Sequence, residues 1–136
     1  MRAVLDVNVI VAGLLCASGA PADVLRAVDD GAFEVVASPS LLAELGRALG
    51  YPKIRRRIAE EDAEAVVRWF AITATVVPHP EEIAPVRSVD GDDDYLIALA
   101  SAHRAVLVAG DNHLLTLAPA IPVFAPREFL AWLESR

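Results

Sequence analysis

The chain has 136 residues, of which 55% are apolar, enough for one domain with a sizeable core. With a formal net charge of −7, the chain lacks the overall basic character of many nucleic-acid-binding domains. Acids gathered at a metal site count in that sum without their metal, so the charge alone does not exclude nucleic acid. The single cysteine, Cys16, excludes an intramolecular disulfide and suits a reducing cytoplasm. We expect no signal peptide, because the sequence starts directly with an apolar strand pattern and shows no basic region followed by an apolar stretch and a cleavage site. We expect no membrane span, because the apolar stretch 7–17 is short and interrupted.

Strand and helix patterns alternate along the chain. Strands are predicted over residues 3–5, 33–37, 73–77, 105–109 and 121–124. Helices are predicted over residues 9–15, 22–29, 39–49, 60–72, 95–102, 112–117 and 126–133, and residues 79–89 read as a loop. This alternation predicts an α/β fold, with a parallel sheet covered on both faces by helices, in a single domain over residues 1–136.

Acidic residues follow apolar runs or open helices at four places in the sequence. Asp6 ends the first strand, Glu44 lies on the first turns of the helix after the second strand, the cluster 90–94 opens a helix, and Asp111 follows another strand. Ligand sites in open parallel sheets form outside the carboxyl ends of the strands. Carboxylates gathered there need raised pKa values or bound cations, and hard oxygen ligands favour Mg²⁺ or Mn²⁺.

Each acid also has a purely structural explanation. Asp6 and Asp111 could cap the helices that follow them, and Glu44 could lie on a solvated helix face. One or two acids of the cluster 90–94 could cap a helix, but four acids in five residues exceed what capping requires. Asp94 is the best ligand candidate of the cluster, because it begins the apolar helix. The common position of all these acids at one predicted sheet edge favours a site for metal-assisted phosphodiester chemistry.

Four stretches, in this order, resemble the PIN-domain family, and within it the VapC-like toxin components of bacterial toxin–antitoxin pairs. They are VLDVNV at 4–9, SPSLLAEL at 38–45, DGDDDYLIALA at 90–100 and VAGDNHLL at 108–115. The resemblance spans nearly the whole chain. Each motif is weak alone, whereas the ordered set is specific.

The resemblance implies a three-layer α/β/α, PIN-like domain with a mostly parallel sheet of about five strands, and a metal-dependent ribonuclease that uses metal-activated water. It also implies a homodimer and a cognate antitoxin that blocks the site. By position, the catalytic quartet is Asp6, Glu44, Asp94 and Asp111, and the candidate metal ligands are Asp6, Asp92, Asp94 and Asp111. Asn8 corresponds to a polar position that orients Asp6 or substrate, and Gly91 stands where relatives often have proline.

A basic run follows the helix that carries Glu44. Lys53, Arg55 and Arg56, with Arg57 beside them, would suit contacts with RNA phosphates next to an acidic pocket. A solvated surface, or pairing with acids of a partner protein, would explain the same run.

Two other functions remain open from the sequence. Asp6 and Asn8 after a strand superficially resemble the start of haloacid-dehalogenase phosphatases, but those usually have a second acid at position 8 and a later lysine, and no lysine follows Lys53. A non-catalytic PIN-fold module that acts through protein or RNA association is the other alternative.

Overall fold

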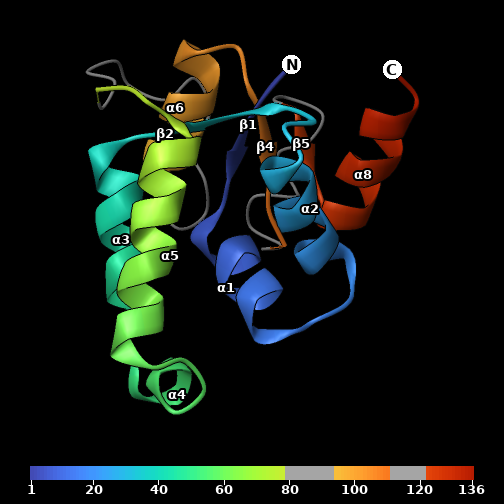
Figure 1. Ribbon diagram of the computed structural model, residues 1–136. Coiled ribbons are helices and arrows are strands. Elements are labelled where there is room, and N and C mark those ends of the chain that lie inside the picture. Colours follow the sequence, from blue (N-terminus) through green and yellow to red (C-terminus); the bar gives the residue numbers. More distant parts are fainter. Residues whose placement is uncertain (79–93, 111–121) are drawn as a thin grey trace.

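A five-stranded parallel sheet forms the centre of the molecule in a computed structural model that describes residues 1–78, 94–110 and 122–136. The strands are β1 (Arg2–Leu5), β2 (Glu34–Ala37), β3 (Thr75–Val76), β4 (Val106–Val108) and β5 (Val123–Phe124). Their order is β3-β2-β1-β4-β5, and every pairing is parallel (Figure 1). The predicted parallel α/β sheet is therefore confirmed, with the strand that precedes Asp6 at its centre.

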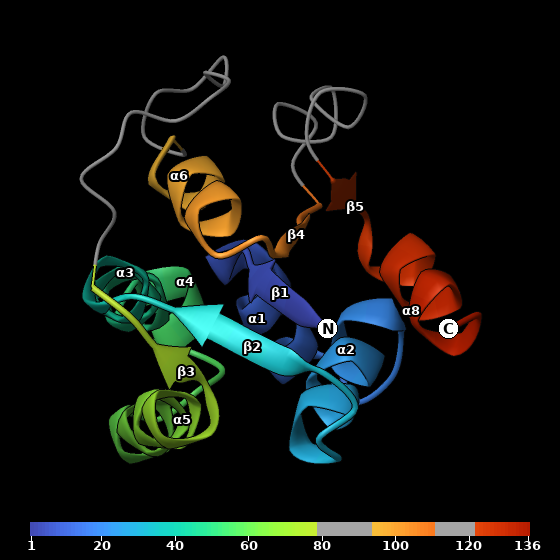
Figure 2. The ribbon, with the colours of Figure 1, turned by 90° about the horizontal axis from the view of Figure 1, so that it is seen from above.

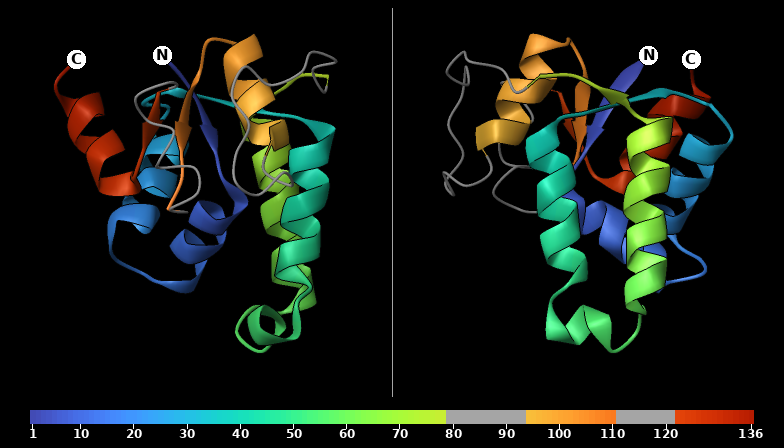
Figure 3. Two further views of the ribbon diagram at one scale, coloured as in Figure 1. Left: turned by 180° about the vertical axis from the view of Figure 1, so that it is seen from behind. Right: turned by 60° about the vertical axis from the view of Figure 1, so that its left-hand side comes forward.

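Helices cover both faces of this sheet. They are α1 (Val7–Leu15), α2 (Ala20–Asp29), α3 (Pro39–Leu49), α4 (Pro52–Arg55), α5 (Glu60–Thr73), α6 (Asp94–Ala102) and α8 (Pro126–Glu134). Viewed from above, α6 lies on one face, while α2 and α8 lie on the other (Figure 2). The helices α3 and α5 lie side by side, with α4 at their far end (Figure 3). The three-layer α/β/α architecture follows from this arrangement.

The sequence explains where several of these elements start and stop. Ser38 is fully buried, and its hydroxyl accepts a hydrogen bond from the Leu41 backbone N–H at 3.3 Å, which caps α3 as predicted. Pro39 stands at the first helical position, where its missing N–H costs nothing. Gly31, just beyond α2, has a φ of 72°, a conformation that favours glycine.

A continuous apolar core fills the space between the sheet and the helices. Leu5 of the central strand, Leu41 and Leu45 of α3, and Phe70 of α5 are fully buried. Phe33 and Phe129 meet edge to face, with ring centroids 4.9 Å apart, and join the start of β2 to α8. This core fixes the central strand that ends at Asp6 and the helix α3 that carries Glu44.

The observed boundaries differ from the predicted ones at a few places. The first helix begins at Val7, two residues earlier than predicted, and Asp6 is its N-cap, because the Asp6 carboxylate accepts the Asn8 backbone N–H. The strand β3 covers only Thr75–Val76, since α5 continues through Thr73. The short helix α4 was not predicted. The predicted loop 79–89 and helix 112–117 lie outside the described residues.

Among the residues described, no single helix has the length and hydropathy of a membrane span, while α1 and α2, bent by 99°, pass that test together on length and composition alone.

Candidate active site

Asp6 stands at the carboxyl end of the central strand. Its backbone N–H donates to the Val108 carbonyl of β4 at 2.9 Å, so the residue is anchored to the neighbouring strand. Its carbonyl accepts the Val9 and Ile10 N–H groups, and its carboxylate accepts the Asn8 N–H at 3.3 Å. The side chain is 5% exposed. Asp6 therefore caps α1, as the structural explanation predicted, and is held rigidly at the edge where a site was expected.

Glu44 projects from the second turn of α3 and is paired with Arg47, one turn further along. The Arg47 Nε donates to Glu44 Oε2 at 3.2 Å, and Nη2 donates to the same oxygen. No described residue donates to Oε1 of Glu44. The side chain of Glu44 is 35% exposed, compared with 62% for that of Arg47. Glu44 is thus held by one oxygen, and its other oxygen remains available to a ligand.

The ion pair with Glu44 shifts the protonation equilibrium of Arg47. The pKa of Arg47 is raised above its ordinary value, mainly by its hydrogen bond to Glu44 and then by the charge of that carboxylate. The phenol groups of Tyr51 and Tyr95 contribute in the same direction.

The helix α6 begins at Asp94 and packs against β1, β2 and β4. Because α6 ends shortly before β4 begins, its first residue lies towards the edge where the parallel strands end. Ala98 and Ala100 are buried, and their small side chains allow the close approach to the sheet. The side chain of Asp94 lies outside the described part of the structure, as do Asp92, the remainder of the cluster 90–93, and Asp111.

The oxygen donors that are described fit a hard divalent cation. Asp6 and Glu44 supply carboxylates, the ligand type that Mg²⁺ and Mn²⁺ prefer. Within residues 1–78, 94–110 and 122–136, no group of three or more acidic, histidine or cysteine side chains is placed to hold a metal. A complete metal site therefore requires acids beyond Asp6 and Glu44, and the sequence offers them in the cluster 90–94 and at Asp111.

The basic run lies on and after α4, at the end of the α3–α5 pair that is remote from the sheet (Figure 1). The Arg57 Nη2 donates to the Leu15 carbonyl at the end of α1, at 2.9 Å. Arg55 Nη1 is buried and makes no hydrogen bond to any described residue. Lys53 and Arg56 are exposed. Arg57 thus has a structural role, while Lys53 and Arg56 remain open to solvent or a ligand.

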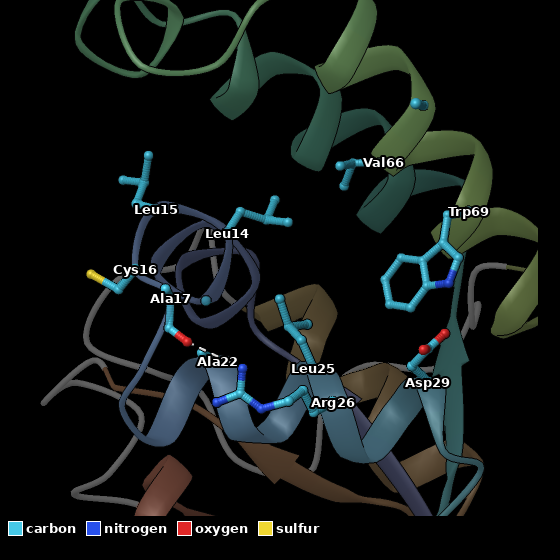
Figure 4. A pocket seen from close by; sticks show the side chains of 12 residues that line it. Leu14, Leu15, Cys16, Ala17, Ala22, Leu25, Arg26, Asp29, Val66 and Trp69 are labelled. Carbon is cyan, nitrogen blue, oxygen red and sulfur yellow. Dashed lines mark hydrogen bonds between the residues drawn. The ribbon is translucent and has the colours of Figure 1, made fainter.

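Described residues of α1 line a larger and a smaller cavity. The larger one, about 720 Å³, opens between α1, α2 and α5, and Trp69 lies across it from Leu25 and Asp29 (Figure 4). The smaller one, about 450 Å³, is lined by Asn8 and by Gly110, the residue after the end of the β4 segment. Of these two, the smaller one borders the ends of β1, β4 and β5.

Sequence reasoning missed Arg47 and Arg127. The position of Arg47, three residues after Glu44 on a helix, could have revealed the pair. Nothing in the sequence marks Arg127, because its place beside Asn8 depends on tertiary structure.

A family model for the PIN domain matches residues 2–113. The chain belongs to the PIN domain family. The resemblance seen in the sequence motifs is thereby confirmed at the level of the family.

Three individual proteins are similar to this PIN domain. An uncharacterized protein of Methanocaldococcus jannaschii, MJ1680, is 26% identical over 117 residues, which cover 86% of this chain and 75% of the relative. The VapBC2 structure from Rickettsia felis, bound to a DNA fragment from its promoter, superimposes with a TM-score of 0.64 at 17% identity. The FitAcB structure from Neisseria gonorrhoeae gives 0.62, also at 17% identity. Each of the two structural matches covers 92% of this chain and 98% of the solved chain, so the whole PIN fold is shared.

Proposed function

We propose that this PIN domain is a divalent-metal-dependent endoribonuclease and the toxin of a toxin–antitoxin pair. The observation that carries the proposal is the position of Asp6, a buried carboxylate at the carboxyl end of the central parallel strand. Glu44 on α3 and Asp94 at the start of α6 belong to the elements that border this edge. In a chain of the PIN domain family, this arrangement supports hydrolysis of phosphodiesters more strongly than it supports the haloacid-dehalogenase alternative.

Asp6, Glu44, Asp94 and Asp111 are the acids proposed to act at this edge, with Asp92 as a further ligand. A divalent cation held by them would activate water and offset charge on the scissile phosphodiester. The hydrogen bond from the Asn8 N–H orients the Asp6 carboxylate, and Arg47 fixes one oxygen of Glu44. We expect Lys53 and Arg56 to approach phosphates further along the RNA, because both are exposed and neither forms an ion pair with a described residue. Arg55 belongs to the same proposed surface, and its half-buried side chain would have to turn outward to reach a phosphate.

A partner protein and a homodimer are also proposed. The VapBC2 and FitAcB structures support the first, because their names denote two-component assemblies. The apolar cavity between α1, α2 and α5 offers a surface on which apolar side chains of such an antitoxin could pack. The test is co-purification of this chain with its genomic neighbour, followed by loss of any RNA cleavage in the complex.

The nuclease itself is tested by incubating the purified chain with a mixed panel of structured RNAs in Mg²⁺, in Mn²⁺ and in EDTA. We expect cleavage that needs metal, leaves 5′-phosphate and 3′-hydroxyl ends, and disappears in Asp6→Asn and Asp94→Asn. The matched control is Asp62→Asn, which removes an exposed carboxylate from the first turn of α5. Full cleavage by a folded Asp6→Asn variant, or cleavage that persists in EDTA, would sink the assignment and leave a binding module as the alternative.

A further inference from the structure

The cavity of about 450 Å³ beside Asn8 lies at the end of three neighbouring strands. Asn8 follows β1, Gly110 follows β4, and Pro126 follows β5. Crevices at the carboxyl ends of parallel strands are where α/β proteins bind their ligands. The volume lies within the range of roughly 300–1,000 Å³ that is usual for small-molecule pockets. The cavity therefore lies at the same edge of the sheet as Asp6, although Asp6 does not itself line it.

Its lining is apolar apart from two side chains with free hydrogen-bonding groups. Ala12 of α1, Pro21 of α2 and Pro126 of α8 contribute apolar surface. Asn8 and Arg127 are exposed, and neither side chain makes a hydrogen bond or ion pair with any residue that the structure describes. An apolar pocket with a few convergent polar groups is typical of a specific binding site.

We propose that this cavity is a subsite for one unpaired nucleotide of the RNA substrate, adjacent to the phosphodiester that is cut. The proposal rests on the proposed ribonuclease function. The base lies against the apolar walls, the Asn8 amide bonds to the polar edge of the base, and the Arg127 guanidinium contacts the neighbouring phosphate.

The chemistry of these groups matches a nucleotide. An amide side chain carries both a donor and an acceptor, so it can pair with a base edge. A guanidinium binds phosphate through several N–H groups. Proteins read RNA sequence mainly from single strands whose bases are unstacked and enter pockets of this kind. Because Asn8 is two residues from Asp6, a base held there places its phosphate near the acidic edge.

The test measures binding separately from cleavage. The probe is a fluorescein-labelled, phosphorothioate-linked single-stranded RNA hexamer in Mg²⁺, checked for integrity afterwards, and binding is followed by fluorescence anisotropy at several salt concentrations. Arg127→Ala should raise the Kd about tenfold and reduce the slope of log K against log salt by about 0.7, the value for one lost phosphate contact on a single strand. Ala12→Leu fills the cavity and should raise the Kd without changing the slope.

The matched control is Arg68→Ala, which removes the same charge from an exposed position on α5, away from the cavity. It should leave the Kd within about twofold, a change of no more than about 0.4 kcal/mol. The subsite is refuted if the hexamer does not bind the parent protein, or if Arg127→Ala and Ala12→Leu bind it as the parent does.

The two proposals fail in different ways. Metal-dependent RNA cleavage by the parent, with normal hexamer binding by both variants, would refute the subsite alone. Weakened hexamer binding by both variants, without any metal-dependent cleavage by the parent, would refute the ribonuclease and leave a nucleotide-binding site.

Discussion

Replacing Gly13 with alanine tests how closely α1 and α2 must pack to shape the edge of the sheet. A Cβ atom at Gly13 would lie 2.7 Å from Leu25 Cδ1 and 2.8 Å from the Pro21 carbonyl oxygen. The leucine end can rotate away, whereas the backbone oxygen moves only if α2 moves. Overpacking of this kind costs about 1–3 kcal/mol, while alanine in place of glycine gains about 1 kcal/mol in helix propensity. The difference between the overpacking cost and the propensity gain is about 0–2 kcal/mol. We expect Gly13→Ala to lower the free energy of unfolding by about 1–2 kcal/mol, in the upper part of this range, because the contact with the backbone oxygen is not relieved by a side-chain rotation.

Gly46 in α3 provides a matched control, because a Cβ there would meet nothing within 4 Å. Gly46→Ala should raise the free energy of unfolding by about 0.5–1 kcal/mol. Urea unfolding, monitored by circular dichroism, measures the free energy of unfolding of both variants. With an m-value of about 2 kcal/mol/M, the midpoints of the two variants should differ by about 1 M. Equal midpoints, or a Gly13→Ala variant more stable than the parent, would refute the close contact of α1 with α2.

Three further predictions concern single side chains. Ser38→Ala should lower the free energy of unfolding by about 1 kcal/mol, because it removes the side-chain cap of α3. An unchanged midpoint in urea would contradict that role. Arg47→Ala should change the free energy of unfolding by less than about 1 kcal/mol, since an exposed ion pair stabilises little. It should nevertheless slow RNA cleavage by releasing the Glu44 carboxylate, and unchanged cleavage would remove Arg47 from the site. The pKa of Glu34 is lowered by hydrogen bonds from Thr75 and Arg2, so its contribution to stability is present above the unfolded value of about 4.5 and is lost as pH falls through the lower folded value. Glu34→Gln should therefore be less stable than the parent near neutral pH and should converge with it in urea titrations at pH below 4.

The sequence was most informative where one strong local pattern coincided with a single structural role. The apolar run before Asp6 predicted the central strand and placed its acid at the carboxyl end, and Ser38 with Pro39 predicted the start of α3. The first helix was predicted to begin at residue 9 but begins at Val7, because both Asp6 and Asn8 are residue types that cap helices well and the local pattern cannot separate two candidates so close together. Helix α4 was missed because four residues cannot show helical periodicity.

The tertiary parts of the site could not be predicted from the sequence. The cavity beside Asn8 brings together the ends of β1, β4 and β5, and no local pattern records which strands are neighbours in a sheet. Arg127 became a candidate binding residue because it lines the same cavity as Asn8 in the folded chain. The acidic quartet was proposed from sequence motifs, and it stays a prediction for all four residues. The side chains of Asp94 and Asp111 lie outside the described residues.

The claim on which the account depends is that the carboxyl edge beside Asp6 is a divalent-metal site. Anomalous X-ray scattering from crystals soaked in Mn²⁺ tests this directly, because it locates the ion without assumptions about activity. We predict an anomalous peak about 2.0–2.3 Å from a carboxylate oxygen of Asp6, with acids of the cluster 90–94 among the other ligands. Saturating Mn²⁺ that leaves the Asp6 carboxylate without a bound ion would contradict the account.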